Sequence, residues 1–334
     1  MISILGAAGG AGMALSEYLA KTGNYALRAF VAPWDDRERV RRLQELDIEI
    51  SEGNITRPED ISRAVEGAWA VVNCVAVLPG DGDKRIQYEV NVRAAENILR
   101  FSKQAGVIRL VHISTAGVAS HGGGAAEDES ASYRQPQNIH VWSKIEAEKT
   151  LDKVSREIKY YCVIIRPASI YGPHMRFRWH ELFEYARKGK MVMLDGGKAP
   201  YALIHERDLA RAIELSLTKP ERLSENEKII ISSDEDITFG RIVNFVANYF
   251  VVAQPRSVPS MLALCASIVL RCVPGFAKPA QLKGVTFQTI MEYIKGHRYN
   301  TTKAKNVLQF QVNVPFDDGM REALERYKTK GALL

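Results

Sequence analysis

The chain has 334 residues, of which 46% are apolar and 25% are charged. This composition is typical of a soluble globular protein with a sizeable core, either one unusually large domain or a large domain with a smaller appendage. A net charge of +6 would suit an anionic ligand, but the basic residues are dispersed and not interleaved with aromatic ones, which argues against a nucleic-acid partner.

The cysteines argue against a disulfide framework and against a metal centre. Cys74, Cys162, Cys265 and Cys272 form no CxxC pair and have no companion histidine at zinc spacing. The N-terminal apolar run starts at Ile2 without the basic segment and cleavage site of a signal peptide. We therefore expect no metal and a cytoplasmic protein.

The first half of the chain alternates short β-rich apolar runs with amphipathic stretches, which is the pattern of repeated βαβ units. The expected strands lie at residues 2–5, 26–31, 48–50, 70–75, 109–114 and 160–166. They predict a doubly wound parallel sheet, the Rossmann type of α/β fold, over residues 1–175. Residues 176–334 are expected to form mainly a smaller C-terminal substrate-binding lobe, with short strands near 201–205 and 228–232 returning to the core.

Local signals place two helix ends. Gly23 follows Lys21 and is expected to end the first helix, because glycine adopts a left-handed conformation at little cost. Thr56 and Glu59 in TRPE predict a capping box at the start of a later helix, with Pro58 just inside it.

The sequence ILGAAGGAG places Gly6, Gly9 and Gly12 directly after the first strand and at the start of the first helix. This spacing allows a tight turn, a close approach of the backbone to a pyrophosphate, and close packing of the helix on the strand. The helix N-terminus adds N–H donors and a positive dipole end. We expect a dinucleotide to bind here, against Gly10 and Ala11 as well.

The residue after the second strand commonly decides between NAD and NADP. An acidic side chain binds the free ribose hydroxyls of NAD, whereas an arginine accommodates the 2′-phosphate of NADP. Here Ala32 supplies neither interaction, and DDRERVRR (residues 35–42) places Asp35 and Asp36, and then Arg37 and Arg39, slightly further on. The same segment is also typical of a solvated helix start, because its acidic residues come first. Because no carboxylate stands at the end of the strand and several arginines lie nearby, NADP is favoured, with NAD as the alternative.

The longest apolar run is MLALCASIVL, residues 261–270. It is about half as long as the ~20 residues that a membrane-spanning helix needs, so we expect no stable membrane insertion. A buried helix, or one wall of an apolar substrate pocket, is favoured over a membrane-docking patch. A second notable segment is the polar loop at 120–132, whose position before HVWSK (140–144) suits an active-site lid.

Several segments resemble motifs of the extended short-chain dehydrogenases/reductases, the group of NAD-dependent epimerases/dehydratases and 3β-hydroxysteroid dehydrogenase-like proteins. GAAGGAG is similar to the family's GATGFLG, EGNIT to EGDLT, NVRAAEN to NVxGTxN, RPASIYGP to RPxxVYGP and IHERDLARAI to VHVDDVARAI. ISTAGVAS matches the strand that carries the catalytic Ser or Thr, which falls on Thr115. The resemblance covers nearly the whole chain and specifies a family, but no substrate.

The resemblance implies roles for individual residues. Thr115 would hydrogen-bond the substrate oxygen, and Lys144 would hold the nicotinamide ribose while hydride moves between nicotinamide and carbon. The implied substrate contacts are Leu78, Tyr133 and His174. The implied cofactor-binding residues are Gly6, Gly9, Gly10, Ala11, Gly12, Ala32, Arg37, Asn54, Ile55, Val75, Ala76, Lys144 and Pro167. The pair His205 and Asp208 is implied to be structural.

One position departs from the family pattern of Tyr, three residues and Lys, because His140 stands four residues before Lys144. The reference pKa of histidine is about 6.5 against about 10 for tyrosine, and a nearby lysine cation disfavours the imidazolium form. Neutral imidazole removes an alcohol proton well but is a poor proton donor to a ketone oxygen. Imidazole is also shorter than phenol, so a bridging water could fill the gap. Alternatively another group supplies the proton, with Tyr133 as a candidate; His174 lies where the resemblance implies a substrate contact.

Three functions fit this sequence. The first is an NAD(P)-dependent oxidoreductase that interconverts a secondary alcohol and a ketone on a hydrophobic or polycyclic small molecule, using Thr115, His140 and Lys144. The second is a nucleotide-sugar epimerase of the same family; a dehydratase is disfavoured because Ala116 and Gly117 stand where it has an Asp-Glu pair. The third is a dinucleotide-binding protein, or a non-redox enzyme for cyclisation or elimination, that keeps the cofactor structurally. A homodimer is a family expectation.

Overall fold

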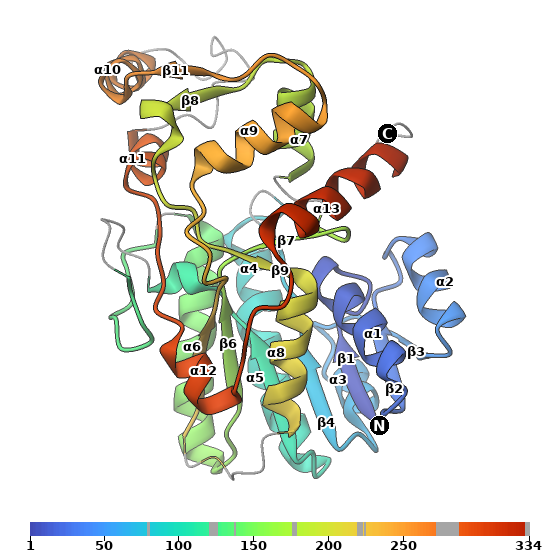
Figure 1. Cartoon of the computed structure of the whole chain (residues 1–334). Coiled ribbons are helices and arrows are strands. Elements are labelled where there is room, and N and C mark those ends of the chain that lie inside the picture. The colour runs from blue at the N-terminus through green and yellow to red at the C-terminus, as the bar shows by residue number, and fades with distance from the viewer. Residues whose placement is uncertain are drawn as a thin grey trace.

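The computed structural model describes residues 1–78, 81–119, 126–136, 138–175, 179–218, 223, 225–271 and 287–330. A seven-stranded sheet with helices on both faces occupies one end of the molecule, and a group of helices with short strands occupies the other (Figure 1). The polar loop expected at 120–132 is described only from residue 126, and Cys272 lies outside the described residues.

The strands of the sheet follow the expected apolar runs. They are β1 (Ile2–Leu5), β2 (Leu27–Val31), β3 (Glu49–Glu52), β4 (Ala70–Asn73), β5 (Arg109–Ile113), β6 (Val163–Pro167) and β10 (Glu227–Ile231). All neighbouring pairs are parallel, in the order β10-β6-β5-β4-β1-β2-β3. The winding direction reverses between β1 and β4, and such a switch point opens a crevice at the carboxyl ends of the strands. The expected Rossmann fold is confirmed.

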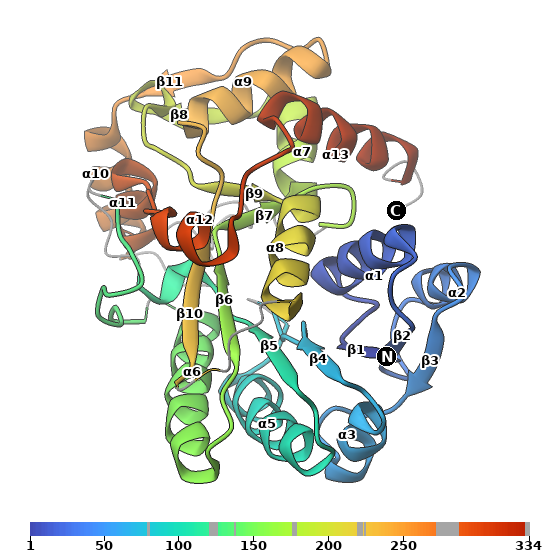
Figure 2. The same ribbon diagram turned by 60° about the horizontal axis from the view of Figure 1, so that its bottom comes forward.

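Helices cover both faces of this sheet (Figure 2). On one face lie α1 (Gly10–Thr22), α2 (Arg37–Glu45) and α8 (Glu206–Thr218), and on the other lie α3 (Pro58–Val65), α5 (Ala94–Gln104) and α6 (Ile139–Ile158). Ile2 and Ile4 of β1 belong to the apolar cluster of the first face, and Leu5 belongs to that of the second. Because alternate residues of a strand point to opposite faces, a strand covered on both sides needs the continuous apolar run seen here.

The remaining elements stand mostly beyond the carboxyl edge of the sheet (Figure 1). They include two short parallel pairs, β7 (Ser169–Tyr171) with β9 (Leu203–His205) and β8 (Val192–Leu194) with β11 (Arg256–Val258). The helices are α7 (Trp179–Arg187), α9 (Phe239–Tyr249), α10 (Ser260–Arg271), α11 (Phe287–Lys295), α12 (Thr302–Leu308) and α13 (Phe316–Lys330). The strand expected near residue 228 joins the main sheet as β10, whereas β9 pairs with β7. A domain boundary at residue 175 stays a prediction.

One of the two expected helix ends is confirmed. Gly23 ends α1 with a left-handed φ of 66°. The capping box at Thr56 is wrong, although Pro58 does open α3. The N-cap is Arg57, without a side-chain hydrogen bond, and the Thr56 hydroxyl donates to the side-chain oxygen of Asn54 (2.9 Å). The Thr56 hydroxyl is therefore engaged by Asn54 in a local turn and does not cap the helix.

The apolar run at 261–270 forms most of α10, but the expectation of a buried helix is wrong for three of its large apolar side chains. Met261, Leu262 and Ile268 are 69%, 60% and 55% exposed. Within the part of the chain that is described, no helix combines the length and apolar character needed to cross a bilayer.

Candidate active site

The glycine-rich turn joins β1 to α1 at the switch point of the sheet. Gly6 has a left-handed φ of 76°, and its carbonyl oxygen accepts a hydrogen bond from the Gly9 N–H (3.0 Å). A Cβ on Gly6 would lie 3.1 Å from Val75, and one on Gly12 would lie 2.2 Å from the Gly6 oxygen. Side chains would therefore fill this turn, and their absence leaves a backbone-lined cradle that fits a pyrophosphate.

Past β2, the structure brings a different arginine to the turn than the one expected. Arg39 donates to the Ala8 oxygen (2.9 Å) and to the His174 oxygen (3.0 Å). Arg37 instead pairs with Glu52 (2.9 Å) on the surface. Residues two apart on a helix point to different sides, so the spacing in DDRERVRR could not distinguish the two arginines.

An acidic group also lies where β2 ends. The Asp35 carboxylate accepts a hydrogen bond from the Ala32 N–H over 2.7 Å. Both kinds of cofactor-selecting side chain, a carboxylate and a guanidinium, thus flank this end of the crevice. Further along, Ile55 is buried beside the cluster of the second face, and the Asn54 N–H donates to Asp60 (2.8 Å).

The side chain of Lys144 is held at the end of β5, two residues before Thr115. Its ammonium group is buried and donates to the Ile113 carbonyl oxygen (2.8 Å). Thr115 follows that strand in an extended conformation, and its hydroxyl oxygen accepts from the Gly117 N–H (3.2 Å). Burial lowers the pKa of Lys144 to about 8. The Lys144 ammonium group thus lies at the end of the strand that Thr115 follows.

His140 lies one helical turn before Lys144 on α6, so the two side chains share a face. Its Nδ1 atom is 3.0 Å from the Val77 carbonyl oxygen. Because a carbonyl can only accept, Nδ1 carries the proton and Nε2 carries the lone pair. Burial, and secondly the charge of Lys144, lower the pKa of His140 to about 4. The expected neutral imidazole is therefore supported, with burial as the larger cause.

Asn91 organises the backbone that holds His140, and sequence reasoning did not single it out. Its side-chain oxygen accepts from the Val77 N–H (2.8 Å), and its amide nitrogen donates to Ser143 on α6 (2.9 Å). Asn91 is buried in a π-helical turn, Glu89–Arg93, between α4 (Lys84–Tyr88) and α5. The signal was present in NVRAAEN, which begins with this residue.

The family pattern of Tyr, three residues and Lys occurs once in the chain, at Tyr299 and Lys303. The alignment of His140 with the family's tyrosine therefore has one alternative. Tyr299 forms a β-bridge with Glu127, and Lys303 lies on α12, which packs against β10 and α8. His140 and Lys144 instead begin the helix that packs beside the end of β5. We therefore take His140, and not Tyr299, as the residue at the position of the family's tyrosine.

Comparison with known proteins agrees with this geometry. The sequence model of the NAD dependent epimerase/dehydratase family matches residues 2–232. The chain belongs to this family. Sterol-4-alpha-carboxylate 3-dehydrogenase, decarboxylating, of Bos taurus is 24% identical over 97% of this chain and 92% of its own. The 2-alkyl-3-oxoalkanoate reductase of Shewanella oneidensis is 24% identical over 85% of this chain and 77% of its own.

A solved structure gives the same picture of the fold. UDP-glucuronic acid 4-epimerase from Bacillus cereus, in complex with NAD, has a TM-score of 0.78 at 18% identity and covers 98% of both chains. The relatives of this epimerase/dehydratase family member are named as dehydrogenases, reductases and epimerases of small molecules. The expectation of an NAD-dependent enzyme is confirmed at this level.

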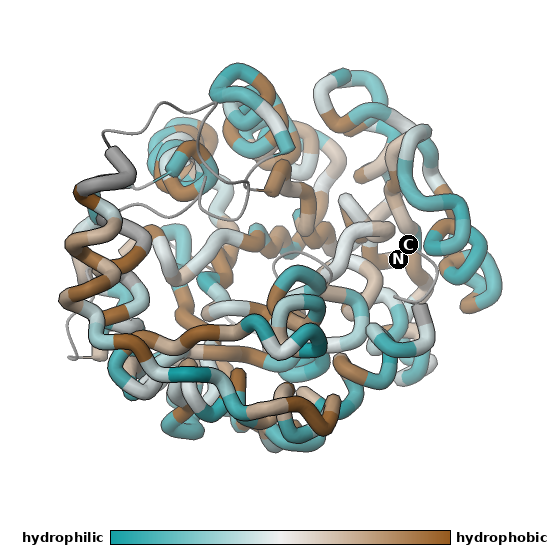
Figure 3. Tube along the Cα trace, turned by 90° about the horizontal axis from the view of Figure 1, so that it is seen from above, coloured by the Kyte–Doolittle hydropathy of each residue, from teal (hydrophilic) through white to brown (hydrophobic). Residues whose placement is uncertain are grey.

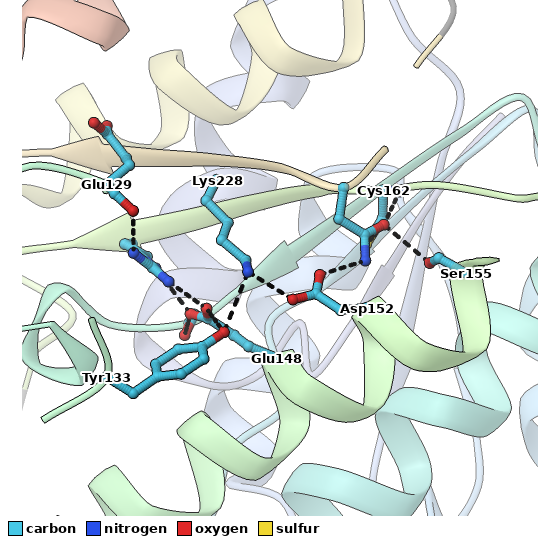
Figure 4. A network of polar contacts seen from close by, with 10 residues as sticks. Glu129, Tyr133, Glu148, Asp152, Ser155, Cys162 and Lys228 are labelled. Carbon is cyan, nitrogen blue, oxygen red and sulfur yellow. Dashed lines mark hydrogen bonds and ion pairs between the residues drawn. The ribbon is translucent and has the colours of Figure 1, made fainter. Parts of the chain in front are cut away.

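Behind the site of this family member, a buried ion pair ties α6 to β6 (Figure 4). Glu148 and Arg166 are both buried and lie 2.6 Å apart. The Ser114 hydroxyl, next to Thr115, donates to Glu148 (2.5 Å). Glu148 stands one turn after Lys144 on α6. The pair of Glu148 and Arg166 therefore holds this face of α6 against β6, and the Ser114 bond holds it against the end of β5, which Thr115 follows.

Tyr133 belongs to this network and not to the proton-transfer group. Its hydroxyl donates to Glu148 (3.0 Å) and accepts from Lys228 (3.2 Å), as Figure 4 shows. Burial and neighbouring carboxylates raise the pKa of Tyr133 well above its usual range. The hydroxyl thus has two structural partners, and its contact with substrate stays a prediction.

His174 is also drawn into an ion-pair cluster. Its Nδ1 lies 2.6 Å from Glu206, and its Nε2 lies 3.7 Å from Glu17 on α1. Burial alone would lower the pKa of His174, but the hydrogen bond with Glu206 and the ion pairs with Glu206 and Glu17 outweigh it and raise the pKa to about 9. The ring lines a cavity of about 940 Å³ between α1, α2 and α13. Thr115, His140 and Lys144 are absent from the described lining, so we leave His174 out of the proton-transfer group.

The other expected residues lie at the carboxyl ends of the strands or support them. Val75 and Ala76 follow β4, Pro167 ends β6, and Leu78 follows the residue that holds His140 and is 38% exposed. The Asp208 carboxylate accepts from the N–H groups of Asn313 (3.0 Å) and Val314 (3.1 Å), which fits its expected structural role. Burial raises the pKa of the Cys74 thiol to about 12, in keeping with packing and not nucleophilic chemistry.

Proposed function

We propose that this chain is an NAD(P)-dependent dehydrogenase that oxidises a secondary alcohol to a ketone on a largely apolar small molecule. The observation that carries the proposal is the contact between His140 Nδ1 and the Val77 carbonyl. That contact presents Nε2 as a proton acceptor, and burial beside Lys144 keeps the ring neutral. Such a group is suited to removing an alcohol proton.

The residues would divide the work as follows. The glycine-rich turn, from Gly6 to Gly12, would hold the pyrophosphate, and Val75, Ala76 and Pro167 would line the crevice. The bound dinucleotide supplies a hydride acceptor. Thr115 would donate a hydrogen bond to the substrate oxygen, and Lys144 would hold the nicotinamide ribose. His140 Nε2 would take the hydroxyl proton, directly or through one water, while the carbinol C–H bond gives up its hydride and a carbonyl forms.

The names of two relatives suggest a substrate class. One acts on a sterol-4-alpha-carboxylate at carbon 3, and the other on a 2-alkyl-3-oxoalkanoate. In both names the carboxylate is attached to the carbon next to the reacting one. We therefore place 3-hydroxy acids with a large apolar part first among the candidates. A nucleotide sugar is the second, because the fold matches that of UDP-glucuronic acid 4-epimerase.

The proposal is tested by following the nicotinamide absorbance with NAD⁺ and NADP⁺ and a panel of 3-hydroxy acids, sterols and UDP-sugars. His140→Phe keeps a ring and removes the acceptor, so kcat/KM for oxidation should fall roughly 100-fold or more. His140→Tyr should restore a proton donor and raise the reduction rate relative to oxidation. Turnover that ignores the Phe change would remove His140 from the mechanism. Dinucleotide binding without redox change on any substrate would favour the structural-cofactor or non-redox alternatives.

A further inference from the structure

Helix α10 presents its apolar side chains to the outside of the molecule. Met261, Leu262 and Ile268 are all more than half exposed, whereas Ser267 is 2% exposed and its hydroxyl donates to a carbonyl of its own helix (2.7 Å). A surface helix in water has the opposite arrangement, with the apolar stripe toward the protein. Seen from above, hydrophobic colour follows this helix at the left rim (Figure 3). The outer face of α10 is thus suited to an apolar environment.

The chain around α10 is basic. No aspartate or glutamate occurs from residue 237 to residue 291, although the whole chain has 39 of them. The same stretch contains five basic residues in the sequence; of those whose side chains the structure describes, Arg256 is exposed, whereas Arg241 pairs with Glu235 (3.2 Å) and Asp317 (2.9 Å). The carboxylate of Asp195, from elsewhere in the chain, accepts from the Ser260 N–H (2.9 Å) at the first turn of the helix. Residues 250–271, which include β11 and α10, thus carry basic residues and no acidic one, which favours an anionic partner.

The strand that leads into α10 adds to the same surface. β11 pairs with β8 so that Arg256 stands beside Val192. Arg256 is exposed, and Val192 is 52% exposed, at the end of the molecule where α10 lies (Figure 1). Apolar side chains with neighbouring basic ones are the combination that sits at a bilayer interface, with the former among acyl chains and the latter at the headgroups.

We propose that α10 docks on the surface of a membrane that contains anionic lipids, with Met261, Leu262 and Ile268 inserted at the interface. The helix has 12 residues, or ~18 Å, against a hydrocarbon core of ~30 Å. It is therefore long enough to lie in the interface but too short to cross. A second copy of the chain is the competing occupant, but the exposed Arg256 beside this face would repel its counterpart in that copy, whereas anionic headgroups attract it. The inference is independent of the proposed function.

The test uses the full chain and vesicle flotation. Vesicles of phosphatidylcholine with about one quarter phosphatidylserine are compared with phosphatidylcholine alone. We expect binding to the anionic vesicles that weakens when salt is raised from about 0.1 M to about 0.5 M. The triple change Met261→Gln, Leu262→Gln and Ile268→Gln should lower the partition coefficient roughly 100-fold. All three side chains are exposed, so the fold should be kept, and an unchanged Tm checks this.

Ile108→Gln is the matched control, because Ile108 is 70% exposed but precedes β5 at the opposite end of the sheet. It should bind vesicles as the unchanged protein does. Absence of binding to anionic vesicles, or equal binding by the triple variant, would overturn the proposal. A dimer in solution that the triple variant loses would assign the α10 face to a second copy and would also overturn it.

Discussion

His140 and Val77 form a contact of 3.0 Å between the Nδ1 atom and the carbonyl oxygen, and it fixes which ring nitrogen is free for chemistry. Val77 lies four residues after β4 and is itself held by Asn91. The backbone between β4 and the π-helical turn therefore determines that Nε2, and not Nδ1, is the ring atom that can accept a proton. A tyrosine hydroxyl both donates and accepts, so the histidine narrows the family's proton transfer to one direction at neutral pH.

The pH dependence of turnover should show whether His140 transfers the proton in the oxidation direction only. Oxidation needs neutral His140, whose pKa is lowered to about 4, so kcat/KM for the alcohol should be flat near neutral pH and fall only below about pH 4. Reduction of the ketone needs the imidazolium form, so its rate should decline as pH rises above about 4. Both are measured with saturating cofactor. An oxidation limb centred on the ordinary histidine value of about 6.5 would contradict the assignment.

The buried pair of Glu148 and Arg166 should be a large determinant of stability. Glu148→Ala leaves a buried guanidinium without its carboxylate, so the free energy of unfolding should fall by about 3–5 kcal/mol. Lys149→Ala is the control, because it breaks an exposed pair with Glu146 (3.0 Å) on the same helix and should cost under about 1 kcal/mol. Urea unfolding measures both. Equal losses of unfolding free energy in the two variants would show that the buried pair contributes no more to stability than the exposed one.

Much of the scaffold could be predicted because it rests on local patterns. Continuous apolar runs and the glycine spacing identified the first six strands and the turn at Gly6. Contacts between distant segments could not be read in this way. The spacing of Arg37 and Arg39 does not say which one turns toward Ala8, and no local pattern links Tyr133 to Glu148. The exposed face of α10 was missed because periodicity shows which residues share a face, but not what covers that face.

Cofactor choice should depend on Arg39 and Asp35, and we keep NADP as the proposed preference. Arg39→Ala should weaken NADPH binding about tenfold relative to NADH, because a guanidinium is the usual partner of the 2′-phosphate. Asp35→Asn should shift the ratio further toward NADPH by reducing repulsion of that phosphate. Arg37→Ala is the control, since Arg37 pairs with Glu52 instead. Calorimetric titration gives the affinities. Equal loss of both cofactors in Arg39→Ala would limit its role to holding the turn.

His174 should make stability depend on alkaline pH. Its pKa is raised to about 9 in the folded chain, against about 6.5 when unfolded, so the folded state binds the proton more tightly. This contribution is fully present below about pH 6.5 and is lost as pH rises through about 9. His174→Asn removes it, so the difference in unfolding free energy between the two proteins should shrink over that interval. Unfolding in urea at a series of pH values measures the difference.

A second variant checks the cause of that dependence. The pKa of Glu17 is lowered to about 2, chiefly by its interaction with His174 at 3.7 Å. Glu17→Gln removes one of the two carboxylates that hold the imidazolium, so the pKa of His174 should fall and stability should be lost at a lower pH than in the unchanged protein. NMR titration of the His174 ring reports that pKa directly. An unshifted titration in Glu17→Gln would leave Glu206, 2.6 Å from Nδ1, as the partner that sets it.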